Sequence, residues 1–283
     1  MALPATCLRP FIFDRAVLGL VDDLRAARLA HFACFHVTND AVRLDSRLDT
    51  VDARSRAMAD VALALRREGA LPAWRDEPYA VARRFDDPPV LLIERGAARY
   101  LGVRTYAAHV NGIVHADGET RMWLARRSPQ KKVDPGMLDN LVGGGVAAGF
   151  RVDATVVKEA WEEAGVPERL ARHARPAGML HSRRPMFDGL QRETLFVHDL
   201  ALPPDFIPAN QDGEAVEHRL VSVADAARAI AVANGHDEVT LDASLVVLDY
   251  LIRQGHVQPD QPCYAALAAL RLLPLSAGET SFV

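Results

Sequence analysis

The chain has 283 residues, of which 49% are hydrophobic and 25% are charged, and its formal net charge at pH 7 is -4. These values are ordinary for a globular protein with room for two modest domains, each with its own core. The 33 basic residues are balanced by 37 acidic ones, which excludes an extended basic surface for nucleic acid, and no apolar run approaches the ~20 residues of a membrane span. We therefore expect a small-molecule substrate as partner, with no nucleic acid and no membrane.

Three cysteines, Cys7, Cys34 and Cys263, are odd in number, widely spaced and in no metal-binding pattern. This usage is typical of free thiols in a reducing compartment. The opening residues, MALPATCLRPFIFDRA, lack the basic start and the apolar stretch of a signal peptide. We therefore expect a cytoplasmic location.

The first hundred residues predict a small α+β unit. Residues 14–31 mix apolar and charged positions at helical spacing and predict a helix that packs on a core. Residues 31–38 and 42–46 read as strands on either side of a turn. Residues 53–68, rich in Ala and Arg, predict a second helix.

A change of pattern follows a stretch punctuated by prolines, residues 71–89. Residues 90–103 predict a strand, a turn and a short closing strand, and a new strand pattern begins at Tyr106. We place a domain boundary near residue 104. The prediction is an N-terminal α+β domain over residues 1–104 and a second domain over residues 105–283.

The second domain opens with a predicted β-hairpin. Residues 106–114 and 121–125 read as its strands, and Asp117 and Gly118 form a credible turn between them.

A basic connection, residues 126–145, leads away from the hairpin. Arg127 and Lys132 are candidate substrate-binding residues, because guanidinium and ammonium groups are the usual partners of phosphate. A solvated basic loop is an equally good interpretation of this stretch.

A short helix is well marked between Asp153 and Gly165, behind a glycine loop at residues 143–145. Asp153 is a good N-cap, Gly165 stands where a left-handed residue ends a helix, and Pro167 prevents its continuation. The marks define a helix of about three turns, with an apolar face that includes Val156 for the core.

Three glutamates of this helix, Glu159, Glu162 and Glu163, stand at i, i+3 and i+4 and therefore share one face. Like charges at this spacing repel each other, and a bound divalent cation is the natural compensation. Mg²⁺ suits such a site because it takes a few carboxylates and leaves positions for phosphate oxygens. The close approach that glycine allows makes the backbone carbonyl of Gly144 a further candidate metal ligand. A solvated acidic helix face is the alternative, although it explains neither the glycine loop nor the capped length.

The segment from the glycine loop to the end of this helix resembles the Nudix box. That pattern reads Gly, five residues, Glu, seven residues, Arg Glu, an apolar residue, any residue, Glu Glu, any residue, Gly, an apolar residue. The positions that match are Gly144, Glu159, Ala160, Glu162, Glu163, Gly165 and Val166. Two positions depart from it, since Phe150 replaces the early Glu and Lys158 replaces the Arg. The resemblance implies an α+β fold, a Nudix α/β/α sandwich with a mixed sheet, beside the smaller N-terminal domain.

A narrower resemblance covers nearly the whole chain. Residues 192–230 look like the corresponding stretch of a two-domain Nudix group related to the thiamine pyrophosphokinase-linked hydrolases of plants and fungi, and residues 8–80 resemble that group's N-terminal domain. Members of this group also carry Lys before the first helix glutamate and a non-acidic residue at the position of Phe150. The implied activity is Mg²⁺-dependent hydrolysis of thiamine diphosphate, or of its oxidised or damaged analogues, to the monophosphate and phosphate.

The resemblance also implies roles for single residues. Glu162 and Glu163 are the expected principal metal ligands, Glu159 coordinates or orients, and Glu214 is preferred over Glu217 as a ligand or as the base that activates water. An exposed turn residue is the alternative interpretation of Glu214. The residues alone leave two interpretations of Arg192, as of Arg183 and Arg184: each is either a substrate phosphate contact or a surface residue.

Other functions remain open at this level. The substrate is alternatively another nucleoside diphosphate derivative, or the chain is a non-catalytic Nudix-fold binding or regulatory module, as the changes at Phe150 and Lys158 suggest. The metal is Mg²⁺ or Mn²⁺, and the oligomeric state is undetermined, with a homodimer among the options. An isomerase of the isopentenyl diphosphate type is disfavoured, because such enzymes use a cysteine near the glycine loop and this chain has none between residues 35 and 262.

The sequence says less about how the organic part of the substrate is bound. Trp123, Trp161 and Phe187 have rings that stack well on a heteroaromatic group, although each is more often a core residue. We treat the histidines as structural. The N-terminal domain is expected to supply part of the pocket, because binding sites favour domain junctions.

Overall fold

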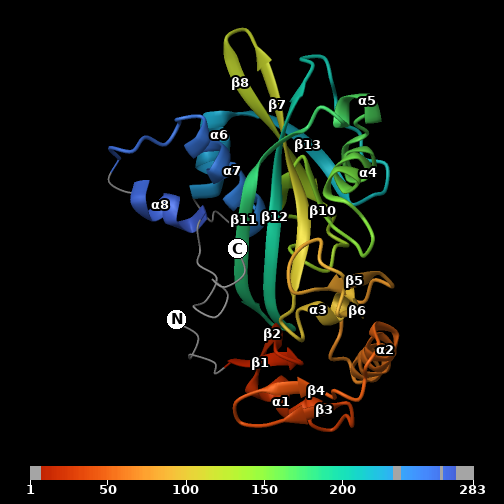
Figure 1. Ribbon diagram of the computed structural model, residues 1–283. Coiled ribbons are helices and arrows are strands. Elements are labelled where there is room, and N and C mark those ends of the chain that lie inside the picture. The colour runs from red at the N-terminus through yellow and green to blue at the C-terminus, as the bar shows by residue number, and fades with distance from the viewer. Residues whose placement is uncertain (1–7, 232–236, 262–263, 272–283) are drawn as a thin grey trace.

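The computed structural model describes residues 8–231, 237–261 and 264–271 (Figure 1). Its N-terminal elements are β1 (Leu8–Phe13), β2 (Ala16–Asp22), α1 (Asp23–Leu29), β3 (Phe35–Val37), β4 (Val42–Leu44), α2 (Val51–Arg67), β5 (Pro78–Val81), β6 (Leu91–Glu94) and α3 (Arg95–Ala98). The first four strands form one sheet in the order β2-β1-β4-β3, and β5 pairs with β6 in a separate hairpin. These elements form the predicted small α+β unit.

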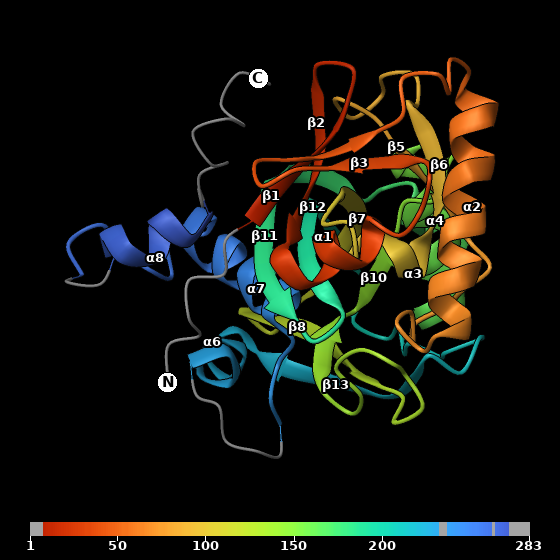
Figure 2. The same ribbon diagram turned by 90° about the horizontal axis from the view of Figure 1, so that it is seen from below.

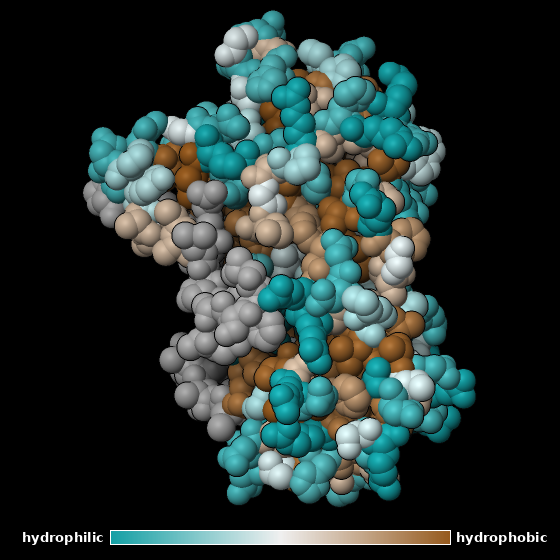
Figure 3. Space-filling view, viewed as in Figure 1, coloured by the Kyte–Doolittle hydropathy of each residue, from teal (hydrophilic) through white to brown (hydrophobic). Residues whose placement is uncertain are grey.

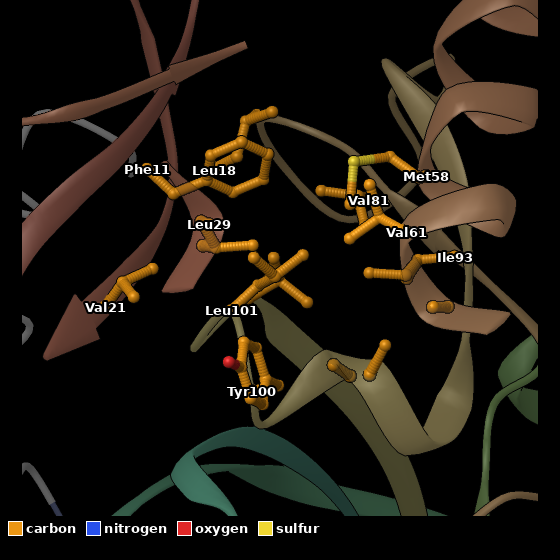
Figure 4. Packing of buried hydrophobic residues seen from close by; sticks show 14 of the residues in the cluster. Phe11, Leu18, Val21, Leu29, Met58, Val61, Val81, Ile93, Tyr100 and Leu101 are labelled. Carbon is orange, nitrogen blue, oxygen red and sulfur yellow. The ribbon is translucent and has the colours of Figure 1, made fainter. Parts of the chain in front are cut away.

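The core of the N-terminal part lies between its sheet, α1, α2 and the β5–β6 hairpin. Figure 4 shows Leu101 among side chains from these elements, including Phe11 of β1, Leu29 of α1 and Met58 of α2. Each of these side chains is 0–1% exposed, and burial of one such side chain stabilises a fold by about 1.5–3 kcal/mol.

The remaining elements form a larger layered unit. They are β7 (Arg104–Ala116), β8 (Glu119–Arg127), β9 (Leu138–Asn140), β10 (Val142–Gly145), α4 (Val152–Ala164), α5 (Glu168–Ala171), β11 (Arg175–Met186), β12 (Gly189–Leu202), β13 (Ala215–Ser222), α6 (Val223–Ala231), α7 (Leu241–Arg253) and α8 (Tyr264–Arg271). The seven-stranded sheet has the order β11-β12-β7-β8-β13, with β10 paired to β7 and β9 paired to β8. The sheet is mixed, because β12 runs parallel to β7 while the other pairs are antiparallel.

Helices cover both faces of this sheet, as Figure 1 shows. On one face, α4 packs Val156 and Ala160 against Val110 and Val142. On the other face, α6 and α7 pack against Ile113, Leu124 and their neighbours. The structure confirms the predicted α+β class and the α/β/α sandwich with a mixed sheet. Among the described residues, no helix is both long and apolar enough to cross a membrane.

The predicted hairpin at the start of this unit is confirmed. Strands β7 and β8 pair in antiparallel register up to Ala116 and Glu119, and Asp117 and Gly118 join them with φ angles of 52° and 76°. Two successive positive φ angles are the mark of a turn whose twist matches that of the strands.

The helix predicted over residues 14–31 is wrong in its first half. Residues 16–22 form β2, which pairs with β1, and the helix α1 begins only at Asp23. The side chain of Asp22 caps α1 by accepting a hydrogen bond of 2.9 Å from the Arg25 backbone N–H. Residues 16–22 therefore form a strand although their apolar residues have helical spacing. The reason is that β1 lies beside them as a hydrogen-bonding partner, and the spacing of apolar residues carries no information about that partner.

Three further local predictions need correction. The strand expected over residues 31–38 is limited to β3, and the closing strand expected after β6 is instead the short helix α3. The glycine loop at residues 143–145 is part of the strand β10, which pairs with β7 through residues 107–110. Glycine is not among the β-branched and aromatic residues that favour strands, so the sequence does not predict a strand here. Pairing with β7 makes this segment a strand.

Only the C-terminal end of α4 agrees with the prediction. Gly165 ends the helix with a left-handed φ of 62°, as expected. The N-cap is Arg151 rather than Asp153, and no side chain caps this end. Asp153 lies inside the first turn, where its negative charge still favours the helix N-terminus.

The two parts of the chain meet at one end of the large sheet. Figure 2 shows the molecule from this end. The Leu190 backbone N–H of β12 donates to the Arg99 carbonyl at 2.9 Å. The guanidinium of Arg99 also pairs with Asp188 at 2.6 Å. These bonds fix the N-terminal elements against β12, although the division near residue 104 itself stays a prediction.

The surface is mostly hydrophilic on the face shown in Figure 3, with apolar residues in smaller areas between. Cys34 is a free cysteine, while Cys7 and Cys263 lie outside the described residues, and the expected reducing compartment stays a prediction.

Candidate active site

A cavity of about 450 Å³ lies where the two parts of the chain meet. Its volume falls within the range of small-molecule sites, which is roughly 300–1,000 Å³. Its walls come from β7, β10 and β12 of the large sheet, from α4, from the first turn of α7 and from the N-terminal part between Ala73 and Arg99. The predicted contribution of the N-terminal domain to the pocket is therefore present in the structure.

One face of the sheet forms the floor of this cavity. Side chains alternate across a strand, so residues two apart share a face. Thr105 and His109 of β7, Gly143 and Gly145 of β10, and Glu193 of β12 all line the cavity. Further along the same face, α7 covers the sheet, and the cavity occupies the part that α7 leaves open.

The glutamates of α4 stand at the edge of the sheet next to β10. Glu159 and Glu162 line the cavity, and a side chain in place of Gly144 would overlap the carboxyl group of Glu159. Burial raises the pKa of Glu159, and the neighbouring charges of Glu162 and Glu214 act in the same direction, while Lys158 opposes them. The close approach of Gly144 thus explains a glycine at this position.

Glu163 is more deeply placed than its two neighbours, with 9% of its surface exposed. Its Oε2 atom accepts a hydrogen bond of 2.7 Å from the Gly143 backbone N–H, at the open edge of β10. Burial raises its pKa well above the usual value, and the charges of Asp139 and Glu159 add to this effect. The site therefore brings several carboxylates together against their mutual repulsion.

Two lysines neutralise these carboxylates. The Lys158 ammonium contacts Glu159 at 2.9 Å and Glu162 at 2.7 Å. The ammonium of Lys131 contacts Glu214, whose Asp-Gly-Glu turn lies beside the cavity. Although burial opposes the effect, the hydrogen bond and charge of Lys131 lower the pKa of Glu214, which is therefore ionised near neutral pH.

The donor set fits a hard divalent cation. Glu159, Glu162, Glu163 and Glu214 offer carboxylate oxygens, which are the ligands that Mg²⁺ prefers. Two ammonium groups already contact three of these carboxylates, those of Glu159, Glu162 and Glu214. Within the described ranges, no three His, Cys, Asp or Glu side chains form a ready-made metal cage. A cation would therefore have to replace the lysine contacts.

The three predicted substrate-binding residues have different positions. Arg127 lines the cavity, where its guanidinium pairs with Asp139 at 2.7 Å and donates to the Val133 carbonyl. Lys132 is exposed and lies outside the cavity wall, and the neighbouring Lys131 takes the expected place. Adjacent residues of a loop point in different directions, and the sequence did not show which of the two lysines faces inward.

Arg192 does not contact the cavity either. It is 8% exposed, and its guanidinium donates at 2.9 Å to the Gly102 carbonyl, where the two parts of the chain join. Burial, together with the charges of Arg104 and Arg183, lowers its pKa to about 10. Successive side chains of β12 point to opposite faces of the sheet, and its cavity-lining residues on either side of Arg192 are Gln191 and Glu193. Arg192 therefore points away from the cavity, and its position fits a structural role.

The aromatic candidates are not at the site. Trp123 belongs to the core, while Trp161 and Phe187 are exposed by 52% and 76%, and none of the three lines the cavity. Glu217 lies outside the cavity and pairs with Arg126 at 2.8 Å, which agrees with the preference for Glu214. His109, treated as structural, lines the cavity while its Nδ1 bonds to the Asn140 side chain at 2.9 Å.

Sequence reasoning missed the cavity residues of the N-terminal part. They surround the β5–β6 hairpin and are Arg75, Glu77, Tyr79, Arg95 and Arg99. The only signal for them was the WRDEPYAV stretch, which carried a resemblance but no assigned role. Contact between the two parts of the chain places these residues, and the sequence spacing does not encode that contact.

Helix glutamates that suit a divalent cation and basic side chains that suit phosphate line one cavity of an α/β/α sandwich, a combination expected of a hydrolase that acts on phosphoric anhydrides. Residues 105–243 match the NUDIX domain, and residues 3–105 match a domain of unknown function, DUF4743. The chain is 37% identical over 261 residues to Nudix hydrolase 24, chloroplastic, of Arabidopsis thaliana, covering 91% of this chain and 71% of the relative. It is 34% identical over 268 residues to Nudix hydrolase 20, chloroplastic, of the same plant, with the same coverage. The chain belongs to the Nudix hydrolase family.

Solved structures align with part of the chain. A protein from Deinococcus radiodurans, DR0079, is 26% identical with a TM-score of 0.44, covering 62% of this chain and 99% of that one. The MutT protein from Methanosarcina mazei Go1 is 18% identical with a TM-score of 0.40, covering 54% of this chain and 95% of that one.

Proposed function

We propose that the protein hydrolyses thiamine diphosphate, or its oxidised or damaged analogues, to the monophosphate and phosphate in the presence of Mg²⁺ or Mn²⁺. The observation that carries this proposal is that the α4 glutamates and basic side chains from both parts of the chain line the same cavity. The choice of thiamine rests on the resemblance of residues 8–80 and 192–230 to the thiamine pyrophosphokinase-linked group.

The α4 glutamates are the residues that would hold the metal. Glu159 and Glu162 face the cavity, and Glu163 stands behind them against β10. When bound, Mg²⁺ supplies charge neutralisation for the diphosphate and lowers the pKa of a coordinated water.

Basic residues at the same end of the cavity suit the phosphate groups. Arg75 lines the wall, is exposed to solvent and forms no ion pair with a described residue. Lys131 lies within contact of Glu214, so a phosphate and this carboxylate would share its ammonium. Charged hydrogen bonds of this kind are among the stronger ones in proteins, and they orient a substrate as well as bind it.

Glu214 is the preferred base. It lines the cavity from outside α4, and Lys131 lowers its pKa, so the carboxylate is ionised near neutral pH and available to a water proton, at the cost of lower basicity. A base on a different element from the metal ligands approaches the attacking water from another side. This arrangement supports hydrolysis at phosphorus.

Two alternatives compete with this proposal. One is hydrolysis of a different nucleoside diphosphate derivative, which the same phosphate end of the cavity would accept. The other is a binding or regulatory module without turnover. The three α4 glutamates favour hydrolysis. Burial raises the pKa of Glu159 and Glu163, so their charged forms are costly, and a binder has no need for such a carboxylate cluster.

The test is hydrolysis by the purified protein with Mg²⁺. It is measured as phosphate release from thiamine diphosphate, oxidised thiamine diphosphate and ADP, and by chromatography of the products from ADP-ribose and a dinucleotide polyphosphate. We expect the largest kcat/KM for a thiamine compound. Changing both Glu162→Gln and Glu163→Gln should lower the rate by roughly a hundredfold or more, the scale of losing metal catalysis. Glu168→Gln on α5, an exposed glutamate outside the cavity, is the matched control.

Far-UV circular dichroism of the double variant must match that of the parent protein. A preference for ADP-ribose or another nucleotide would replace the thiamine assignment. Phosphate release that survives the double substitution would show that the metal site is misassigned.

A further inference from the structure

A second acidic group faces the cavity at a distance from the α4 glutamates. Glu193 of β12 and Asp242 in the first turn of α7 both line the cavity, and β12 is separated from β10 by the strand β7. We call Gln191, Glu193 and Asp242 the β12 end of the cavity. Neither carboxylate forms an ion pair with a described residue, in contrast to the lysine contacts of the α4 glutamates.

One amide group holds the two carboxylates side by side. The Gln191 Nε2 atom donates to Glu193 Oε2 at 3.0 Å and to Asp242 Oδ2 at 3.1 Å. Its own oxygen accepts from the Arg184 guanidinium at 3.2 Å, which sets the orientation of the amide. Thr105 Oγ1 donates to the other oxygen of Glu193 at 3.1 Å. The β12 end is therefore an organised set of acceptors.

Two polar atoms at this cavity have no hydrogen-bond partner. They are the hydroxyl of Tyr79 and Oδ1 of Asp242, and both are shielded from solvent. Tyr79 is 4% exposed, and its hydroxyl lies so close to Gly145 that a side chain there would overlap it. Buried polar atoms are nearly always hydrogen-bonded, so an unpaired donor and acceptor in one cavity point to a ligand that completes them.

The local charge has a definite sign. Glu193 and Asp242 are two acids held together by one amide donor, and a cation bound beside them favours the ionised form of both. Two nearby guanidinium groups each have another carboxylate partner. Arg95 pairs with Glu77 at 2.7 Å and lies 5.3 Å from the centre of the Tyr79 ring, and Arg184 pairs with Asp134 at 2.8 Å. The β12 end thus offers negative charge and acceptors, whereas the phosphate end offers the positive charge of Arg75 and Lys131.

We propose that the β12 end binds the organic part of the substrate through Glu193, Asp242 and the Tyr79 hydroxyl, and selects a cationic or amino-substituted nitrogen heterocycle. An N–H group or a ring cation completes the unpaired oxygen of Asp242, and a ring acceptor completes the hydroxyl of Tyr79. The diphosphate of the same molecule then reaches the α4 glutamates. This inference deepens the proposed function and rests on it for the identity of the bound molecule.

The experiment measures binding without catalysis. Free thiamine, which has the cationic ring and no phosphate, is titrated into the full-length protein in metal-free buffer by isothermal calorimetry. 2-Phenylethanol, an uncharged compound with an aromatic ring and no nitrogen, is the contrast ligand. The variants are Glu193→Gln, Asp242→Asn and Tyr79→Phe, and Asp205→Asn, an exposed aspartate outside the cavity, is the matched control.

We expect thiamine to bind the parent protein and the control with equal Kd, and 2-phenylethanol to bind neither. Glu193→Gln and Asp242→Asn should each raise the Kd for thiamine by roughly tenfold or more, as expected for loss of a charged hydrogen bond. Tyr79→Phe, which removes one hydroxyl and keeps the ring, should raise it by a smaller factor. The melting temperature of each variant shows whether it is folded, and Tyr79→Phe provides the test if a carboxylate variant does not fold.

Binding that is equal in the parent protein and in all three variants would overturn the inference, as would equal affinity for 2-phenylethanol. Failure of the proposed function looks different. If no thiamine compound is hydrolysed and the variants still lose affinity for thiamine, the β12 end stands and the reaction is misassigned.

Discussion

Gly144 lies directly against the carboxyl group of Glu159, and a Cβ atom on this glycine would occupy the space of that carboxyl. Its neighbour Gly145 has the same relationship to the Tyr79 hydroxyl. Since neither glycine has a positive φ, an alanine is conformationally acceptable at both positions, and its effect is the steric overlap of the new Cβ with the neighbouring side chain. The two glycines therefore allow the two ends of the cavity to be disturbed separately.

Gly144→Ala should displace Glu159 and lower kcat by roughly tenfold or more, because a shift of about 1 Å in a catalytic group has effects of this size. Gly145→Ala should displace Tyr79 instead and act mainly on the KM for the thiamine compound. Steady-state kinetics of both variants on thiamine diphosphate provide the comparison. Equal effects of the two substitutions on kcat and KM would contradict this separation of the cavity into two ends.

Lys158 competes with a divalent cation for Glu159 and Glu162. In Lys158→Met the two carboxylates repel each other without compensation, so the protein should be less stable in metal-free buffer and should gain more from Mg²⁺ than the parent does. A tenfold gain in affinity for the cation is worth about 1.4 kcal/mol and moves Tm by about 3 °C in a domain of this size. Thermal melts with and without Mg²⁺ measure the difference, and an identical increase in both proteins would show that Lys158 does not compete.

Arg75 is the residue of the N-terminal part that we propose binds the phosphate groups. Arg75→Ala should raise the KM for the diphosphate by roughly tenfold and leave kcat within about twofold, because one charged hydrogen bond is lost in the ground state and the transition state alike. Arg43→Ala, an exposed arginine on β4 outside the cavity, is the control and should show parent kinetics. A parent-like KM for Arg75→Ala would place the phosphate elsewhere.

Glu193 should make stability depend on pH in a direction opposite to that of an ion-paired acid. Burial, then the charge of Asp242, raises its pKa in the folded protein, so folding favours the protonated carboxyl. The stability that Glu193 contributes is therefore present below the pKa of the unfolded chain and is lost as pH rises through the raised value.

Glu193→Gln removes this dependence. The free energy of unfolding, measured in urea from pH 4 to 8 in metal-free buffer, should fall more steeply with rising pH for the parent than for the variant. At pH 8 the variant should be the more stable protein, because it no longer buries a charged carboxylate. Parallel pH profiles for the two proteins would mean that the Glu193 carboxylate is not perturbed as described.

Much of the phosphate end could be predicted from the sequence. The three glutamates of α4, the left-handed Gly165 and the close approach of Gly144 depend on contacts within about twenty residues, and such local relationships are written in spacing and residue type. The hairpin at Asp117 and Gly118 is local in the same sense. The N-cap assigned to Asp153 failed by two positions, as helix ends often do.

The class of the protein could be inferred from sequence, because the glycines and glutamates at residues 144–166 have the spacing of the Nudix box and that spacing is local to one short helix. Which residues share the cavity with that helix could be known only from the folded arrangement. Lys131 rather than Lys132 faces inward, Arg192 is used at the junction, and Arg75, Tyr79 and Asp242 arrive from elements distant along the chain. The order of the strands in the sheet and the docking of the N-terminal part fix these positions. Contacts between segments distant along the chain produce no regular spacing in the sequence, so they could not be predicted from it.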